Sequence, residues 1–353
     1  MNNKVERFKK SLNENNLDSA IVFKPENRRY LSGFTGTSGY VVITEEKNFF
    51  ITDFRYVNQA SKQCEGFEIL KHTNDRTLYD ILNELGLKNL GFEDAFVTVS
   101  QYNDFNDKLM GISLKPLRDT LDKLRMIKDQ DEIEEIKKAA QIADEAFEYI
   151  CEVIKPGITE WEVALEIENF MKKKGATGTS FDSIVASGIR SSMPHGVASH
   201  KVIENGDFVT LDFGCIYNGY CSDMTRTVVV GKASEKQKEI YNVVLEAQET
   251  ALEAIKPGIT GYEADKVARG IIEAKGFGEY FGHGLGHGVG LEVHESPRLS
   301  PLGKDILKAN MVVTDEPGIY LPDFGGVRIE DLIVVTENGC ERLSKSPKHL
   351  IEL

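Results

Sequence analysis

Short apolar runs and helical spacing divide this chain into two parts. In the first part, three runs of β-branched and aromatic residues are typical of buried strands, and two later segments have helical spacing. The predicted strands and helices cover 20–23, 40–44, 49–52, 78–85 and 102–110. We therefore predict an N-terminal α/β domain over residues 1–120.

A long amphipathic helix opens the second part of the chain. Across residues 133–154, apolar side chains recur at steps of three and four. Asp129 and Glu132 have the spacing of a capping box at its start, and Pro156-Gly157 is a strong stop signal. The charged residues 121–131 before the helix are expected to link the two domains.

The rest of the chain repeats one pattern. Residues 154–159, Ile-Lys-Pro-Gly-Ile-Thr, return unchanged as residues 255–260. Each copy follows an amphipathic helix, starts a second helix with a Thr-x-x-Glu capping box, and leads to a His-Gly-Val segment and an acid-bearing hairpin. We expect residues 132–353 to be one helix–helix–strand–strand unit, duplicated about a pseudo-twofold axis, with both hairpins at one central site.

The first hairpin places two aspartates in a stretch rich in strand-forming residues. Its strands meet at Asn218-Gly219, a strong two-residue turn signal. With these two residues as the loop, Asp212 lies opposite Thr225 and shares a face with Asp223. Diagonal neighbours are roughly 7–8 Å apart at the backbone, which suits two metal ions about 3.5–4 Å apart. The alternative is a solvated hairpin whose acids point outward.

The second hairpin carries Glu316 and Glu330 at matching positions, and a glycine-rich segment with His283 and His287 lies between the hairpins. Buried carboxylates are costly unless a positive charge neutralises them. Four carboxylates with one or two imidazoles favour Mn, Co or Fe over a lone structural Zn. A water that bridges two such ions would ionise near neutral pH. The residues alone therefore support metal-assisted hydrolysis and leave the cleaved bond open; a core role is the alternative for any single histidine.

Composition narrows the function classes. The chain has 353 residues, 41% of them hydrophobic, and a net charge of −14, which disfavours nucleic acid and anionic membranes as partners. Its start lacks an apolar signal core, and no run approaches the roughly 20 apolar residues of a membrane helix. We expect a cytoplasmic protein. Its five cysteines are an odd number without zinc-ligand spacing, and are expected to be reduced thiols.

Together, these segments resemble the Xaa-Pro peptidases, aminopeptidase P and prolidase, of peptidase family M24. The resemblance rests on residues 211–214, 222–226, 283–287, 293–295, 315–318 and 328–331 in the second part, and on 30–34 and 52–56 in the first. It implies an α/β (α+β) chain. A creatinase-like N-terminal α/β domain would precede a duplicated catalytic domain of the pita-bread fold.

The resemblance also implies roles for individual side chains. Two divalent ions, with Mn expected and Co or Zn as alternatives, would be bound by Asp212, Asp223, His287, Glu316 and Glu330. His195, His294 and Glu316 would act in catalysis, and His195, His294, Arg298 and Arg328 would bind substrate. Arg298 resembles the arginine with which some prolidases bind a free carboxylate, which favours Xaa-Pro dipeptides. A solvated Arg298 is the alternative.

Other functions stay open at this point. Aminopeptidase P acts on longer Xaa-Pro-Yaa peptides. Methionine aminopeptidase shares the catalytic architecture but usually lacks such an N-terminal domain, and creatinase has the fold without metals. A non-catalytic peptide-binding protein with a relict site is the alternative from another class. The resemblance further implies a homodimer whose ligand is a proline-containing peptide.

Overall fold

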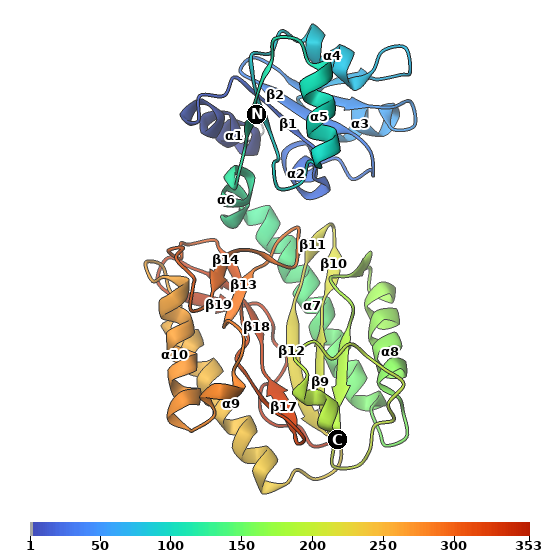
Figure 1. Cartoon of the computed structure of the whole chain (residues 1–353). Helices are drawn as coiled ribbons and strands as arrows, with labels where there is room; N and C mark the ends of the chain where they lie inside the picture. The colour runs from blue at the N-terminus through green and yellow to red at the C-terminus, as the bar shows by residue number, and fades with distance from the viewer. Residues whose placement is uncertain (1–2) are drawn as a thin grey trace. The chain divides into compact units, whose positions relative to one another are not determined.

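The computed structural model describes residues 3–353 (Figure 1). Contacts within the chain define two compact units, Met1–Arg125 and Met126–Leu353, which we call unit 1 and unit 2. Both units mix helices and strands, as predicted. The boundary between the units falls within residues 121–131, whose assignment as a linker stays a prediction.

Unit 1 is built around a six-stranded sheet with the strand order β4-β3-β2-β1-β5-β6. Its elements are α1 (Asn3–Glu14), β1 (Ser19–Val22), α2 (Pro25–Ser32), β2 (Tyr40–Thr44), β3 (Asn48–Thr52), α3 (Val57–Gln63), β4 (Glu68–Lys71), α4 (Leu78–Glu84), β5 (Asn89–Phe92), α5 (Val99–Lys108), β6 (Ser113–Pro116) and α6 (Thr120–Met126). The predicted strands correspond to β1, β2 and β3, and the predicted helices to α4 and α5.

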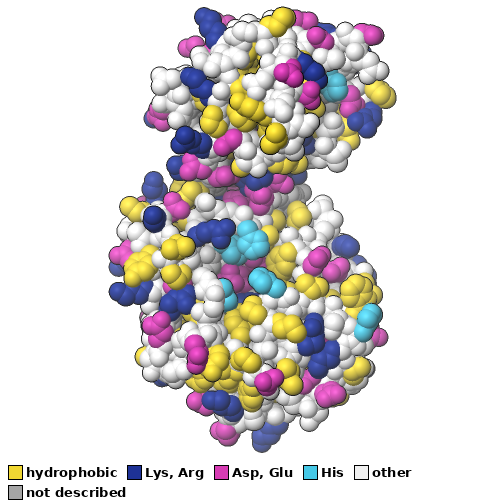
Figure 2. Space-filling model, viewed as in Figure 1, with side chains coloured by type: hydrophobic (Ala, Val, Ile, Leu, Met, Phe, Trp, Pro, Cys, Tyr) yellow, Lys and Arg dark blue, Asp and Glu magenta, His cyan; other side chains and the backbone are white. Residues whose placement is uncertain are grey.

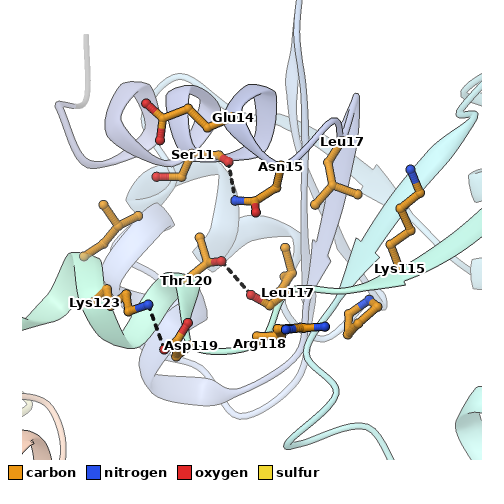
Figure 3. Close-up of a pocket in the computed structure, with 12 residues that line it drawn as sticks. Ser11, Glu14, Asn15, Leu17, Lys115, Leu117, Arg118, Asp119, Thr120 and Lys123 are labelled. Atoms are coloured by element: carbon orange, nitrogen blue, oxygen red, sulfur yellow. Dashed lines mark hydrogen bonds and ion pairs between the residues drawn. The ribbon is translucent and has the colours of Figure 1, made fainter.

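A polar hollow of about 490 Å³ lies in unit 1 beside the end of α1 (Figure 3). The side chains that line it bond to their own neighbours: Lys123 pairs with Asp119, and the Thr120 hydroxyl donates to the carbonyl of Leu117. Neither histidine nor cysteine lines this hollow. It therefore offers neither an imidazole nor a thiol for metal or nucleophilic chemistry.

Unit 2 repeats two helices and a set of strands. The first half comprises α7 (Gln130–Val153), α8 (Glu160–Lys173), β7 (Gly178–Thr179), β8 (Ile184–Ser187), the 3₁₀ helix η1 (Gly188–Ser192), β9 (Phe208–Phe213), β10 (Cys215–Tyr217), β11 (Tyr220–Cys221) and β12 (Met224–Val229). The second half comprises α9 (Glu235–Ala254), α10 (Gly261–Ala274), η2 (Gly278–Tyr280), β13 (Gly286–Gly288), β14 (Glu295–Leu299), β15 (Val312–Asp315), β16 (Gly318–Leu321), β17 (Gly325–Arg328), β18 (Asp331–Val335) and β19 (Cys340–Arg342). The strands lie between the two helix pairs (Figure 1).

Local signals in the two halves match. The predicted capping boxes form at Asp129, Thr159 and Thr260, the last two at equivalent positions before α8 and α10. The same two threonines also form isolated β-bridges, with Val202 in the first half and with Ile306 in the second. The predicted duplication is therefore confirmed.

Packing against the helices decides which way the acids point. Leu211 and Phe213 are fully buried in a core with residues of α7 and α8. Because side chains alternate along a strand, Asp212 faces the opposite side of the sheet. Ile329 packs in the core with α9 and α10, so Glu330 likewise faces away from the helices. Burial of each such Leu, Ile or Phe stabilises this orientation by roughly 1.5–3 kcal/mol.

The expectations about membrane helices and cysteines can be compared with the structure. Within residues 3–353, no helix is long and apolar enough to cross a membrane. The five cysteines are free thiols, as predicted. The cytoplasmic location stays a prediction.

Replacement of Thr260 by Ala should lower the free energy of unfolding by about 1 kcal/mol, because the N-cap bond to the amide of Glu263 is lost. Guanidinium denaturation measures the change. Thr250→Ala, within α9, is the control: its hydroxyl bonds only the preceding turn, and alanine raises helix propensity. Equal losses in the two variants would contradict a capping role.

Candidate active site

The first hairpin has the predicted register. Asp212 pairs with Thr225, and Tyr217 pairs with Tyr220. Asn218 and Gly219 have φ values of 44° and 77°, the positive values that a two-residue type I′ turn requires. The two aspartates therefore share one face of the hairpin.

The second hairpin keeps a single register from end to end. Asp315 pairs with Asp331, and Gly318 pairs with Arg328. Glu316 and Glu330 consequently lie opposite each other between these pairs. The amide of Glu330 also donates to the carbonyl of Thr225 at 3.1 Å, which joins the second hairpin to the first.

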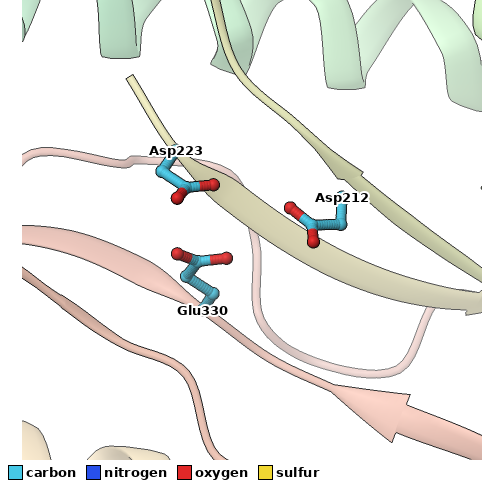
Figure 4. A group of neighbouring side chains, drawn as sticks. All are labelled: Asp212, Asp223 and Glu330. Atoms are coloured by element: carbon cyan, nitrogen blue, oxygen red, sulfur yellow. The ribbon is translucent and has the colours of Figure 1, made fainter. Parts of the chain in front are cut away.

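Three carboxylates converge where the hairpins meet. One oxygen each of Asp212, Asp223 and Glu330 lies within 4.8 Å of the others, and Figure 4 shows the three groups turned toward one another. Burial raises the pKa of Asp223 and of Glu330 well above the ordinary range, and neighbouring carboxylates raise both further. Among the described residues, Oδ1 of Asp212 and Oε1 of Glu330 are buried without a hydrogen-bond partner. Buried acceptors of this kind fit cation binding.

His287 and Glu316 complete this group. Nε2 of His287 is 3.2 Å from Oε1 of Glu316 and 3.7 Å from Oδ2 of Asp223. Nδ1 of His287 lies 3.1 Å from the carbonyl of Gly288, where it can only donate, so Nε2 is the ring nitrogen that would bind a ligand after losing its proton. The structure thus brings all five predicted metal ligands together; their role as ligands stays a proposal.

Two threonines that sequence reasoning missed support these acids. The Thr225 hydroxyl donates to Oε2 of Glu330 at 2.7 Å and accepts from Nε of Arg328 at 3.0 Å. The Thr314 hydroxyl donates to Oε1 of Glu316 at 3.0 Å. The position of Thr225 gave a usable signal, because this residue lies opposite Asp212 in the predicted register.

Hydrogen bonds to neighbouring protein groups hold the guanidinium of Arg328. Its Nη2 is 2.5 Å from Oδ2 of Asp212, and its Nη1 donates to Tyr320 Oη at 2.7 Å. Tyr320 Oη in turn lies 2.9 Å from Nε2 of His283, which places His283 behind the acids. The side chain of Arg328 is only 4% exposed, and its contact with substrate stays a prediction.

The other predicted site residues, His195, His294 and Arg298, lie close enough to one another for their charges to interact. The rings of His287 and His294 are 4.4 Å apart between centroids. Arg298, which is exposed, pairs with His287 across β13 and β14. Burial lowers the pKa of His294, and the charges of His287, Arg298 and His195 lower it further, against the opposing effect of Glu316. Figure 2 shows histidines gathered around a hollow with acidic side chains at its floor.

Family comparisons agree with this geometry. Residues 134–337 match metallopeptidase family M24, and residues 4–127 match the creatinase/prolidase N-terminal domain. The chain belongs to metallopeptidase family M24. It is therefore an enzyme of the peptidase class, and the family assignment implies divalent metal ions.

Similar proteins extend over nearly the whole chain. The structure of an Xaa-Pro dipeptidase from Bacillus anthracis is 52% identical, with a TM-score of 0.97 over 99% of both chains. An Xaa-Pro dipeptidase of Pyrococcus furiosus is 44% identical over 353 residues, 99% of this chain and 100% of that protein. The structure of an X-Pro aminopeptidase from Thermotoga maritima is 41% identical, with a TM-score of 0.91 over 98% of this chain and 100% of that chain.

Replacement of Thr225 by Val should weaken the binding of Mn²⁺ by about 10- to 100-fold, because Glu330 and Arg328 lose their shared partner. Calorimetric titration of the metal-free protein measures the affinity. Thr227→Val is the matched control on the same strand, since that hydroxyl donates to the backbone carbonyl of Arg328. Unchanged affinity in Thr225→Val would contradict the role of this hydroxyl.

The metal-free protein should become less stable as the pH rises from about 5 to 8. The raised pKa values of Asp223 and Glu330 mean that the folded state keeps protons that the unfolded chain releases near pH 4, so the free energy of unfolding falls with rising pH. Thermal melts after chelation measure this slope, and Asp223→Asn should flatten it. Added Mn²⁺ should raise the Tm most at pH 8. A pH-independent Tm would contradict the prediction.

Proposed function

We propose that this protein is a metallo-exopeptidase that hydrolyses the Xaa-Pro bond of dipeptides. The observation that carries the proposal is the convergence of buried carboxylate oxygens, two of them without a partner among residues 3–353. Two divalent ions would be held by Asp212, Asp223, His287, Glu316 and Glu330. Bound there, such ions supply Lewis-acid polarisation of a carbonyl and a nucleophile at neutral pH.

Histidines at the opening are suited to move protons. The lowered pKa of His294 keeps its ring neutral at pH 7, so that it can accept a proton. His195 is exposed on the loop after η1, where a peptide can reach it. Glu316 stays ionised: burial raises its pKa, but the hydrogen bond and charge of His287 outweigh this and lower the pKa to about 2. We infer that Glu316 orients the attacking water.

Arg298 supports a dipeptide as the substrate. As the cross-strand partner of His287, it projects on the same face of the sheet, beside the candidate metal site. A guanidinium binds a carboxylate with two parallel hydrogen bonds, and in an Xaa-Pro dipeptide the proline carries that carboxylate. The dipeptidases among the similar proteins, at 52% and 44% identity, also support this choice.

Aminopeptidase action on longer Xaa-Pro-Yaa peptides is the second candidate, supported by the likeness to the Thermotoga maritima enzyme.

For the resident metal we propose Mn²⁺, because four of the five candidate ligands are carboxylates. The family resemblance supports a homodimer in the cytoplasm.

A peptide panel tests the proposed function. Metal-free protein receives Mn²⁺, Co²⁺ or Zn²⁺ and is offered Ala-Pro, Ala-Pro-Ala, Ala-Ala and Met-Ala. We expect rapid cleavage of Ala-Pro, slower cleavage of Ala-Pro-Ala, no cleavage of Ala-Ala or Met-Ala, and loss of activity on chelation. Equal cleavage of Ala-Ala would remove the proline requirement, and preference for Ala-Pro-Ala would favour the second candidate.

Replacement of Arg298 by Ala should raise the KM for Ala-Pro by about 10- to 100-fold, the effect of losing a charge-assisted hydrogen-bonded pair. The KM for Ala-Pro-Ala should change far less, because its proline carboxyl is in a peptide bond. Steady-state kinetics on both peptides measure the split. Arg342→Ala, far from β14 in the chain, is the control, and equal effects on the two peptides would reject the role of Arg298.

A further inference from the structure

One buried carboxylate outside the candidate metal site makes a dense set of bonds. Glu160 is the first residue of α8, and its side chain is 0% exposed. A charge at such a position is costly unless hydrogen bonds and a counterion compensate for it. The groups that provide this compensation indicate what Glu160 does.

The donors to Glu160 lie on both sides of His195 in the chain. Ser187, which precedes it, donates its amide and hydroxyl to Oε1 at 2.7 and 2.9 Å. Ser199, which follows it, donates its amide and hydroxyl to Oε2 at 3.1 and 2.6 Å. Arg190 provides the counterion, with Nε at 3.0 Å from Oε2. One carboxylate therefore joins the start and the end of the segment that presents His195.

The bonds continue inward to the loop itself. Nη2 of Arg190 donates to the carbonyl of Val197 at 2.7 Å, and Nη1 of Arg328 donates to the carbonyl of Pro194 at 3.2 Å. These contacts fix the backbone just before and just after His195. In the described part of the chain, the His195 ring itself makes no hydrogen bond, so its direction depends on this backbone.

The residue equivalent to Glu160 in the second half, Gly261, also contacts a strand that carries a candidate site residue. Gly261 is the first residue of α10, as Glu160 is the first residue of α8. A Cβ at Gly261 would overlap the carbonyl oxygen of Arg298, so the helix start lies directly against β14. The same position in the repeat thus fixes the His195 loop in one half, through a carboxylate, and the Arg298 strand in the other, through close backbone approach.

We propose that Glu160 is a positioning residue for the peptidase reaction, acting through His195. It holds residues 193–199 so that the His195 ring faces the substrate. Its side-chain bonds go to Ser187, Arg190 and Ser199 and to none of the five candidate metal ligands. Loss of these bonds should therefore change the contact of His195 with substrate and leave metal binding unchanged. The inference rests on the proposed function, since it takes His195 to contact the peptide.

The first test is Glu160→Gln, which keeps the shape of the side chain but replaces one acceptor oxygen by a donor. We expect kcat/KM for Ala-Pro to fall by about 10- to 100-fold, as for small misplacements of a reacting group, with the metal content of the wild type. Glu166→Gln is the matched control on α8. Its carboxylate accepts from Tyr149 Oη at 2.7 Å and should leave kcat/KM unchanged.

A double-mutant cycle separates positioning from a general loss of structure. In a His195→Ala background, Glu160→Gln should change kcat/KM by less than about twofold, because the group through which it acts is gone. The same fold loss in both backgrounds, or wild-type activity of Glu160→Gln, would overturn the proposal. If Glu160→Gln does not fold, Ser199→Ala removes one donor and enters the same cycle. A wild-type protein inactive on Ala-Pro with every metal would instead overturn the proposed function, and this inference with it.

Discussion

Repulsion among buried carboxylates is the constraint on which the arrangement of unit 2 depends. Four acids share one face of two joined hairpins, and of the protein's own cationic groups only Arg328 and His287 form ion pairs with them among the described residues. Two positive groups cannot balance four negative ones in a poorly hydrated site. The opposite face of the second hairpin shows the contrast. There Asp331 is paired with Arg226 at 2.8 Å and Lys348 at 3.2 Å. Protein cations neutralise the helix side of the hairpin, whereas on the other side the acids outnumber the protein cations that pair with them.

Duplication gave two frameworks that have since diverged in detail. In the first hairpin the acids are diagonal neighbours, with Asp212 opposite Thr225, whereas Glu316 and Glu330 lie opposite each other in the second. The longer side chains of the glutamates can reach the same centre from a different register. The helix starts differ as well, since a charged side chain in one half corresponds to a glycine in the other. The two halves therefore share an architecture but differ in their contacts. For this reason the face of the pseudo-symmetric fold that carries the acids is asymmetric.

Turn and capping residues made the register of the first hairpin and the repeat of unit 2 predictable from the sequence. The Asn218-Gly219 turn sets the register of the first hairpin because only a few turn types fit two residues, and the register decides which face Asp212 occupies. Capping boxes at Thr159 and Thr260 marked the repeat. Thr225 and Thr314 were missed, although their strand positions place them beside the acids. Glu160 gave no local signal, because its partners lie 27 to 39 residues away in the chain.

The sequence by itself determined the register of the first hairpin, the capping boxes and the duplication, since turns, caps and side-chain alternation depend on near neighbours. The five converging side chains were implied by the resemblance of their motifs to a known family. The tertiary structure alone decided which oxygens stay unpaired, that Arg328 bonds to Asp212, and that Arg298 lies across from His287. These are outcomes of pairing between distant strands, where register and burial are set by the packing of the whole unit. No single segment contains that information.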